Sequence, residues 1–334
     1  MRRALALAAL LAAFGVPLAY AQESTTTEGT STDGTTTEET LPPPPPVIPD
    51  GVTIAGVSVG GLTADEARVA VRAFFARPVT FTFRGRTKTT TPWWVGASAG
   101  VGSAITNALA AVPGQEVALS VRFDRTRLRA FVARLASAWY RAPVNSRARL
   151  RYLRPTITRA RVGYRIRQYP TRLLIRSAFA VHERGPIATP YRVLQPRITR
   201  SNFGPVIVIR RASHRLYLYK GSQYWTTFGV AVGMPQYPTP LGSFYIVSKQ
   251  RNPWWYPPNA GWAAGASPIP PGPGNPLGTR WMGLSRGGVG IHGTPDSASI
   301  GYSASHGCIR MRIPEAEWLF ERVYVGTPVF IVSA

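Results

Sequence analysis

Two short segments near the carboxyl end of the chain hold the side chains best suited to covalent catalysis. Residues 290–294 read Gly-Ile-His-Gly-Thr, and residues 305–311 read Ser-His-Gly-Cys-Ile-Arg-Met. They contain the only cysteine, Cys308, and two of the four histidines, His292 and His306. Because a free thiol has a pKa of about 8.5, an efficient cysteine nucleophile needs a base or a positive field beside it. Histidine titrates near neutrality, so the combination predicts a cysteine-nucleophile enzyme.

Either histidine is a candidate for the base. His306 lies two residues before Cys308, so both side chains share one face if the segment is extended, unless a turn at Gly307 breaks the alternation. His292 comes from a separate segment and would approach the sulfur from a neighbouring strand. We favour His292 as the base, with its second ring nitrogen oriented by a backbone carbonyl such as that of Gly293.

The neighbouring residues suggest supporting roles. Gly307 lets the backbone come close to a substrate, and the amides around Gly307 and Cys308 are expected to stabilise a tetrahedral oxyanion. Ser305 and Arg310 are expected to support the site or to contact a substrate carboxylate. No carboxylate is evident as a third catalytic member near either histidine, and Asp296 is the nearest acid in the sequence.

Cys308 has several alternative roles on chemistry alone. A lone thiol can be buried and inert, or it can bridge two chains. A zinc site made of Cys308, His306, His292 and Asp296 is a further alternative, although structural zinc sites usually use more cysteines in closely spaced pairs. A last alternative is that these side chains lie together by chance in a β-rich core. The neighbours of Cys308 favour the nucleophile, and we expect no metal or organic cofactor.

The first 50 residues predict export. Residues 1–21 combine Arg2 and Arg3, an Ala/Leu run and a small-residue end, the order of a secretory signal peptide. The run is shorter than the ~20 residues of a spanning helix, so an uncleaved tether to the cytoplasmic membrane is the weaker alternative. Residues 22–50 are rich in Thr, Ser, Glu and Pro and predict a disordered linker. We therefore expect an exported protein of the cell wall or periplasmic space.

The charge balance is strongly basic. The chain has 39 Lys and Arg against 15 Asp and Glu, a net charge of +24, and residues 51–334 alone carry +28. Such a charge is typical of nucleic-acid binding, but export argues against that partner. Anionic cell-wall polymers or lipid headgroups fit better. Arginines supply 36 of the basic residues, so codon bias explains the charge as well as function does.

The 284 residues after the linker suffice for two domains. Residues 51–196 alternate strand and helix patterns and predict an α+β domain with no catalytic constellation. Residues 203–334 contain short strands and turns, which predict a mostly-β, sandwich-like domain. Within it, residues 252–279 are rich in Pro, Gly and aromatic residues. We expect a lid or substrate wall there, with a disordered insertion as the alternative.

Local signals predict several element boundaries in the first domain. Thr63 with Glu66 predicts a capping box at the start of a helix, and Asp124 predicts a second helix cap. The patterns at 52–59 and 87–94 predict continuous strands.

Residues 203–334 resemble the catalytic domain of L,D-transpeptidases (YkuD-like). The resemblance rests on His292-Gly293-Thr294 and on the signature from Ser305 to Met311, with twelve residues between His292 and Ser305. Segments 239–242 and 275–281 agree as well. It implies functional roles for six residues: His292, Ser305, His306, Gly307, Cys308 and Arg310.

The same resemblance implies a reaction. The cysteine would attack the bond after the third residue of a peptidoglycan stem tetrapeptide, and the acyl-enzyme would be resolved by an acceptor amine. The product is a 3→3 cross-link, or a protein anchored to a stem, in cell-wall biogenesis that maintains cell shape. Resolution by water would instead make an L,D-carboxypeptidase or endopeptidase. Beta-lactams of the carbapenem type are expected inhibitors.

A third alternative is a non-enzymatic cell-wall-binding protein. The segment from Gly56 to Thr63, followed by a helix, resembles the peptidoglycan-binding domain of VanW-like proteins. This resemblance implies wall binding by residues 51–196.

Overall fold

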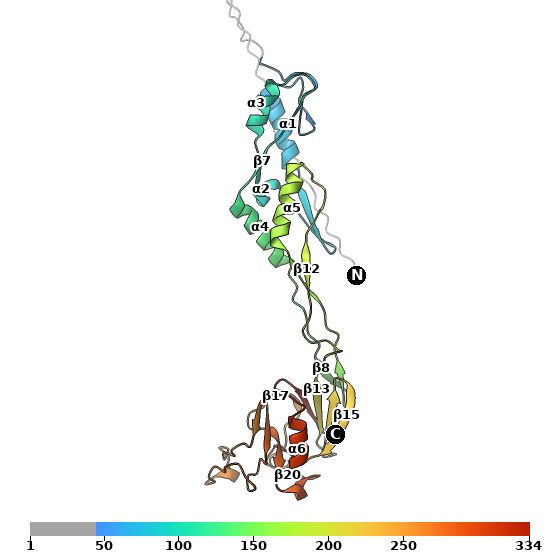
Figure 1. Cartoon of the computed structure of the whole chain (residues 1–334), viewed down its shortest axis with the longest axis vertical. Helices are drawn as coiled ribbons and strands as arrows, with labels where there is room; N and C mark the ends of the chain where they lie inside the picture. The colour runs from blue at the N-terminus through green and yellow to red at the C-terminus, as the bar shows by residue number, and fades with distance from the viewer. Residues whose placement is uncertain (1–44) are drawn as a thin grey trace, which may run out of the picture. The chain divides into compact units, whose positions relative to one another are not determined.

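The computed structural model describes residues 45–334, so the predicted signal peptide and most of the predicted linker lie outside the described residues (Figure 1). Ordered structure begins before residue 51. Ile48 is fully buried, its amide donates to the carbonyl of Leu62 at 2.9 Å, and its carbonyl accepts from Gly61 at 2.9 Å. The end of the predicted linker is therefore part of the fold. In the described part of the chain no helix has the length and apolar character needed to cross a membrane.

The amino-terminal region mixes helices with several small sheets, which confirms the predicted α+β class. Its helices are α1 (Ala64–Ala76), α2 (Pro92–Val95), α3 (Val101–Leu109), α4 (Arg125–Ala138) and α5 (Gln168–Ala180). Its strands are β1 (Thr53–Ile54), β2 (Val57–Ser58), β3 (Val79–Phe83), β4 (Arg86–Thr90), β5 (Ala97–Ala99), β6 (Glu116–Val117), β7 (Val121–Phe123), β8 (Ala148–Arg151), β9 (Arg154–Ile157), β10 (Gly163–Ile166), β11 (Ile187–Ala188) and β12 (Tyr191–Leu194).

Both predicted helix caps are confirmed. The Thr63 hydroxyl accepts from the Glu66 amide, and the Thr63 amide donates to the Glu66 carboxylate at 2.9 Å, so α1 opens with a capping box. The Asp124 carboxylate accepts from the amides of Thr126 and Arg127 at 2.8 and 3.0 Å and opens α4.

Two predicted strands are wrong in part. Residues 52–59 form a hairpin instead of one strand, because Ala55 and Gly56 turn the chain with positive φ angles of 50° and 76°. The strand predicted at 87–94 ends at Thr90. Pro92 starts helix α2 there, since proline fits the first turn of a helix, where its missing amide costs no hydrogen bond.

The carboxy-terminal domain is mostly β, as predicted. Its strands are β13 (Pro205–Arg210), β14 (Arg215–Lys220), β15 (Gln223–Gly229), β16 (Val232–Gly233), β17 (Gly242–Arg251), β18 (Arg280–Leu284), β19 (Gly290–Thr294), β20 (Ser303–Ser305), β21 (Ile309–Arg312) and β22 (Pro328–Val332). Helix α6 (Ile313–Phe320) and two short 3-10 helices, η1 (Gly261–Ala263) and η2 (Ser297–Ser299), complete it. Eight strands form one sheet in the order β15-β14-β13-β22-β17-β18-β19-β21.

Strand β17 joins the two halves of this sheet. Residues Gly242 to Tyr245 pair with β22, and the strand then pairs with β18 beyond a register shift at Ile246. One apolar core holds side chains of both halves, including Ile207 and Leu218 from one and Ile309 from the other, and α6 packs into it. The sheet therefore closes around a core, as expected of a sandwich-like domain.

A hairpin from the preceding region packs on the opposite face of β13. Val206 and Val208 of β13 alternate with core residues and form a separate cluster with Ile157 of β9. The Arg200 guanidinium donates to the carbonyl of Ile157 at 2.8 Å. The β8-β9 hairpin, although it precedes residue 196, thus contacts the eight-stranded sheet directly.

The segment 252–279 is ordered in the structure. Trp255 and Ile269 exchange two backbone hydrogen bonds of 2.9 Å. The side chain of Asn275 is fully buried and donates to the carbonyl of Pro253 at 2.8 Å, and it accepts from the amide of Leu277 at 2.8 Å. This amide ties both ends of the segment together, so it can serve as a wall.

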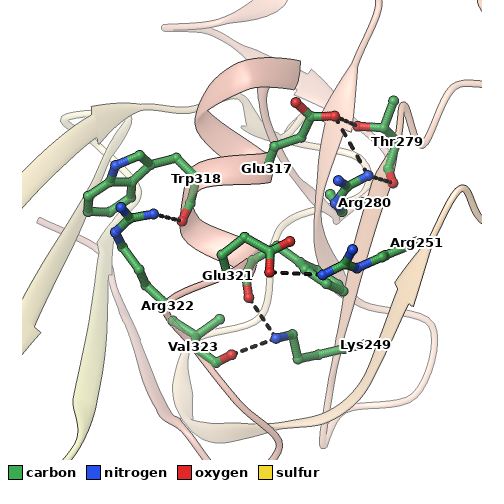
Figure 2. A network of polar contacts seen from close by, with 10 residues as sticks. Lys249, Arg251, Thr279, Arg280, Glu317, Trp318, Glu321, Arg322 and Val323 are labelled. Carbon is green, nitrogen blue, oxygen red and sulfur yellow. Dashed lines mark hydrogen bonds and ion pairs between the residues drawn. The ribbon is translucent and has the colours of Figure 1, made fainter.

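Polar contacts hold α6 against β17 and β18 (Figure 2). The Lys249 ammonium donates to the carbonyls of Phe320 and Val323 at 2.6 Å each, where α6 ends. A positive charge at this position also complements the negative end of the helix dipole. On the same face, Arg251 pairs with Glu321 at 2.9 Å between exposed side chains.

Replacement of this lysine tests the contribution of the helix cap. We expect Lys249→Met to lower the free energy of unfolding by about 2 kcal/mol, because two charge-assisted hydrogen bonds to partly buried carbonyls are lost. Arg251→Met removes an exposed ion pair and a cation–π contact with Phe320 at 5.7 Å, and it should cost about 0–1 kcal/mol. Urea denaturation of the two variants measures the difference, and equal losses would contradict the assignment.

Candidate active site

Strand pairing brings the two predicted segments together. Strand β19 runs parallel to β21, with His292 opposite Arg310 and Ile291 opposite Ile309. Ile291 and Ile309 point into the core, so the alternation sends His292 and Arg310 to the other face. Cys308 directly precedes β21 and lies two residues from Arg310. His292 thus lies on a strand next to the one that follows Cys308.

These side chains line one pocket of about 330 Å³. Of the predicted site residues, five line it: His292, Ser305, His306, Cys308 and Arg310. The segment 252–279 supplies an aromatic wall through Trp254, Trp255, Tyr256 and Trp262.

The hydrogen bond of His292 defines its tautomer. Its Nδ1 lies 2.6 Å from the carbonyl oxygen of Gly293, as the sequence suggested. A carbonyl only accepts, so Nδ1 carries the proton and Nε2 keeps a free lone pair. Burial lowers the pKa of His292 to about 4, with the Gly293 contact opposing the shift and the charge of Arg310 adding to it. His292 is therefore a neutral imidazole at pH 7.

Cys308 is half-buried, and its sulfur donates to the carbonyl of Gly288 at 3.5 Å. Burial raises the pKa of the Cys308 thiol, while the amide of Gly290 and the charge of Arg310 act in the opposite direction. The resting pair is therefore a thiol and a neutral imidazole. Such a thiol needs a base at the moment of attack.

Ser305 and Gly307 build the turn before the cysteine. The Ser305 hydroxyl donates to the carbonyl of Cys308 at 2.6 Å and accepts from the amide of Gly307 at 3.2 Å. Gly307 has a φ of 109°, which an L side chain rarely adopts. Its amide donates to the Ser305 hydroxyl within this turn. Among residues 45–334 the amide of Cys308 has no hydrogen-bond partner and is the donor that remains.

His306 is held by aromatic rings. It stacks on Trp262 with ring centroids 3.9 Å apart and an interplanar angle of 13°, and Tyr237 lies at 5.0 Å. Burial, with a smaller effect of the Arg310 charge, lowers its pKa. The stack connects the catalytic turn to segment 252–279.

Asp296 pairs with Arg310 at 3.8 Å. It therefore contacts the cation of the pocket instead of either histidine. Within residues 45–334 no three His, Cys, Asp or Glu side chains form a group that could hold a metal ion, so geometry gives no support to the zinc alternative.

Two contacts at the site were missed by sequence reasoning. Trp281 stacks on His292 with ring centroids 5.8 Å apart. Gly288 and Gly290 contact the cysteine through their backbone groups. The glycine-rich run at 287–290 is a signal for close backbone approach, although the partner is visible only in three dimensions.

A lone thiol, a neutral imidazole and several aromatic rings thus share one pocket of a mostly-β domain. Residues 204–331 match the family model of the L,D-transpeptidase catalytic domain, YkuD. Residues 96–180 match the model described as "Putative peptidoglycan binding domain". This second match lies outside the segment from Gly56 to Thr63 that first suggested it.

Curated relatives point to the same family as the family model. "Putative L,D-transpeptidase YqjB" of Bacillus subtilis (strain 168) is 34% identical over 134 residues, which cover 39% of this chain and 72% of that protein. "Probable L,D-transpeptidase YbiS" of Escherichia coli (strain K12) is 36% identical over 136 residues, 38% of this chain and 44% of that protein. The chain therefore belongs to the YkuD family of L,D-transpeptidase catalytic domains.

Solved structures show more distant similarity. An L,D-transpeptidase from Mycobacterium smegmatis is 15% identical, with a TM-score of 0.36 over 64% of this chain and 90% of that chain. Another similar structure is an L,D-transpeptidase in complex with imipenem, 17% identical, with a TM-score of 0.35 over 60% of this chain and 85% of that chain.

The raised pKa of Cys308 predicts how its alkylation rate depends on pH. Because the pKa of Cys308 is raised, we expect its alkylation by iodoacetamide to accelerate about tenfold per unit across the range of about pH 6 to 8, as the thiolate fraction grows. N-Acetylcysteine is the reference, and the alkylation rate of Cys308 should reach its plateau at a higher pH than that of N-acetylcysteine. A plateau below pH 8 would instead indicate a thiolate–imidazolium pair and contradict the neutral resting state.

Proposed function

We propose that this protein is a peptidoglycan L,D-transpeptidase that forms 3→3 cross-links, or anchors proteins to stem peptides, through an acyl-enzyme at Cys308. The observation that carries the proposal is the hydrogen bond from Nδ1 of His292 to the carbonyl of Gly293. It leaves Nε2 as a base in the pocket that also holds the sole cysteine. Membership of the YkuD family supports the substrate class.

Acylation begins with proton transfer from the Cys308 thiol to Nε2 of His292. The sulfur attacks the carbonyl carbon of the third stem residue, and the tetrahedral oxyanion accepts a hydrogen bond from the amide of Cys308. The carbon–nitrogen bond to the fourth residue then breaks. His292 returns its proton to the leaving amine, which departs and leaves a thioester on Cys308.

Deacylation reverses these roles. The amine of a neighbouring stem attacks the thioester carbonyl and passes a proton to His292. The carbon–sulfur bond breaks, and the thiolate regains the proton as the new amide is released. The aromatic rings of Trp254, Tyr256 and Trp262 line the pocket in which the acceptor amine would reach the thioester.

Location and wall contact form the second part of the proposal. The match at residues 96–180 supports a peptidoglycan-binding role for the amino-terminal region. The signal-peptide pattern of residues 1–21 supports export to the cell wall or periplasmic space. The net charge of +24 suits an anionic wall surface.

Matched substitutions test the reaction. Incubation with stem tetrapeptides should give cross-linked dimers, detected by liquid chromatography and mass spectrometry. Cys308→Ala should give none, and His292→Gln should slow dimer formation by about 10²-fold or more, the usual contribution of a general base. His214→Gln is the control, because the His214 ring bonds the Ser303 hydroxyl at 3.1 Å and does not line the pocket.

The products decide between the alternatives. Dimer formation that persists in Cys308→Ala would overturn the acyl-enzyme. Tripeptide as the main product of the parent chain would show that water is the acceptor and that the protein is a carboxypeptidase.

Covalent inhibition gives an independent readout. A carbapenem presents a strained amide that a thiolate opens, so we expect one adduct per chain by intact mass. The adduct should be absent from Cys308→Ala and should form more slowly with His292→Gln. An adduct on the Cys308→Ala chain would place the nucleophile elsewhere.

A further inference from the structure

The amino-terminal region contains a groove of about 670 Å³ that the proposed chemistry does not use. One side is formed by the five consecutive residues 87–91 of β4 and the turn after it. The other side comes from α4, through residues that include Phe131, Arg134 and Leu135, and the exposed ring of Trp94 contributes as well.

The groove follows the free edge of a sheet. Strand β4 is the last strand in the order β11-β3-β4 among the described residues. Side chains along a strand alternate between its faces, so a groove that contacts five consecutive residues runs along the edge. An edge presents unpaired amides and carbonyls that can pair with another extended chain.

The hairpin turn determines which groups point outward. Arg84 and Gly85 both have positive φ angles, 45° and 78°, as in a two-residue type I′ turn. Such a turn makes Phe83 and Arg86 a hydrogen-bonded pair, and the pairs alternate from there. Thr87 and Thr89 therefore direct their amides and carbonyls away from β3, into the groove.

The charges of the groove select an anionic ligand. Lys88 and Arg134 line it and are exposed, and within residues 45–334 neither forms an ion pair. No acidic side chain lines it. The floor near Phe131 and Leu135 is apolar, so it can take the apolar side chains of a bound peptide.

We propose that this groove binds a stem peptide of peptidoglycan as an added strand along β4. The inference rests on the wall-binding role proposed above. Stem peptides carry several carboxylates and small methyl side chains on an extended backbone. Backbone pairing supplies affinity in such complexes, while Lys88 and Arg134 would bind the carboxylates. A neutral glycan offers neither feature.

The binding test must separate the groove from the catalytic pocket. Cys308 is the only cysteine, so N-ethylmaleimide blocks the catalytic pocket of the full chain and leaves the groove open. A stem tetrapeptide with a fluorophore at its amino end is then titrated, with anisotropy as the readout. We expect saturable binding by the blocked chain.

Three substitutions locate the bound peptide. Thr89→Pro removes one outward amide without breaking the pairing to β3, and Arg134→Glu reverses one charge. Each should raise the Kd at least tenfold. Arg129→Glu is the matched control, because Arg129 is an exposed arginine of α4 that does not line the groove, and it should change the Kd less than twofold.

Equal binding by Arg134→Glu and Arg129→Glu would overturn the groove assignment. Thermal unfolding shows whether the Thr89→Pro variant is folded. If it is not, the comparison of Arg134→Glu with Arg129→Glu tests the groove by itself. Retention on sacculi that is unchanged in Arg134→Glu, and competed by chitin oligosaccharide but not by peptide, would show glycan binding elsewhere. If the parent chain is not retained on sacculi at all, the wall-binding role itself is refuted. Dimer formation by the unblocked chain reports on catalysis separately.

Discussion

The parallel register between β19 and β21 is the constraint on which the active site depends. It places His292 opposite Arg310 and leaves Cys308 at the start of β21. A slip of one residue would turn Ile291 or Ile309 toward the pocket and bury a polar side chain in the core. Because both isoleucines are fully buried, core packing and catalytic geometry enforce the same register.

Burial then determines the protonation states. Desolvation lowers the pKa of His292 and raises that of Cys308, so both groups rest uncharged. A neutral pair avoids the cost of two buried charges before the substrate arrives. The contact of Nδ1 with the Gly293 carbonyl is what makes this pair useful, since it directs the basic nitrogen toward the pocket.

The sequence was most informative where chemistry is local. The caps at Thr63 and Asp124 and the mostly-β class could be predicted, because each depends on neighbouring residues or on periodicity. The hydrogen bond from the Gly307 amide to the Ser305 hydroxyl could not be predicted, because it forms in a turn that no periodicity reveals. The role of Asn275 in ordering segment 252–279 depends on partners up to 22 residues away.

The position of Trp281 explains why two residues near the site are glycines. An added Cβ at Gly290 would collide with the indole ring, and one at Gly283 would lie against the indole nitrogen and the Ser248 hydroxyl. These residues are therefore small because a large ring must lie flat across β18 and β19. That ring stacks on His292 and helps to exclude water from it. Burial is the largest cause of the low pKa of His292, so a larger residue at Gly290 would alter the surroundings of this base by displacing Trp281.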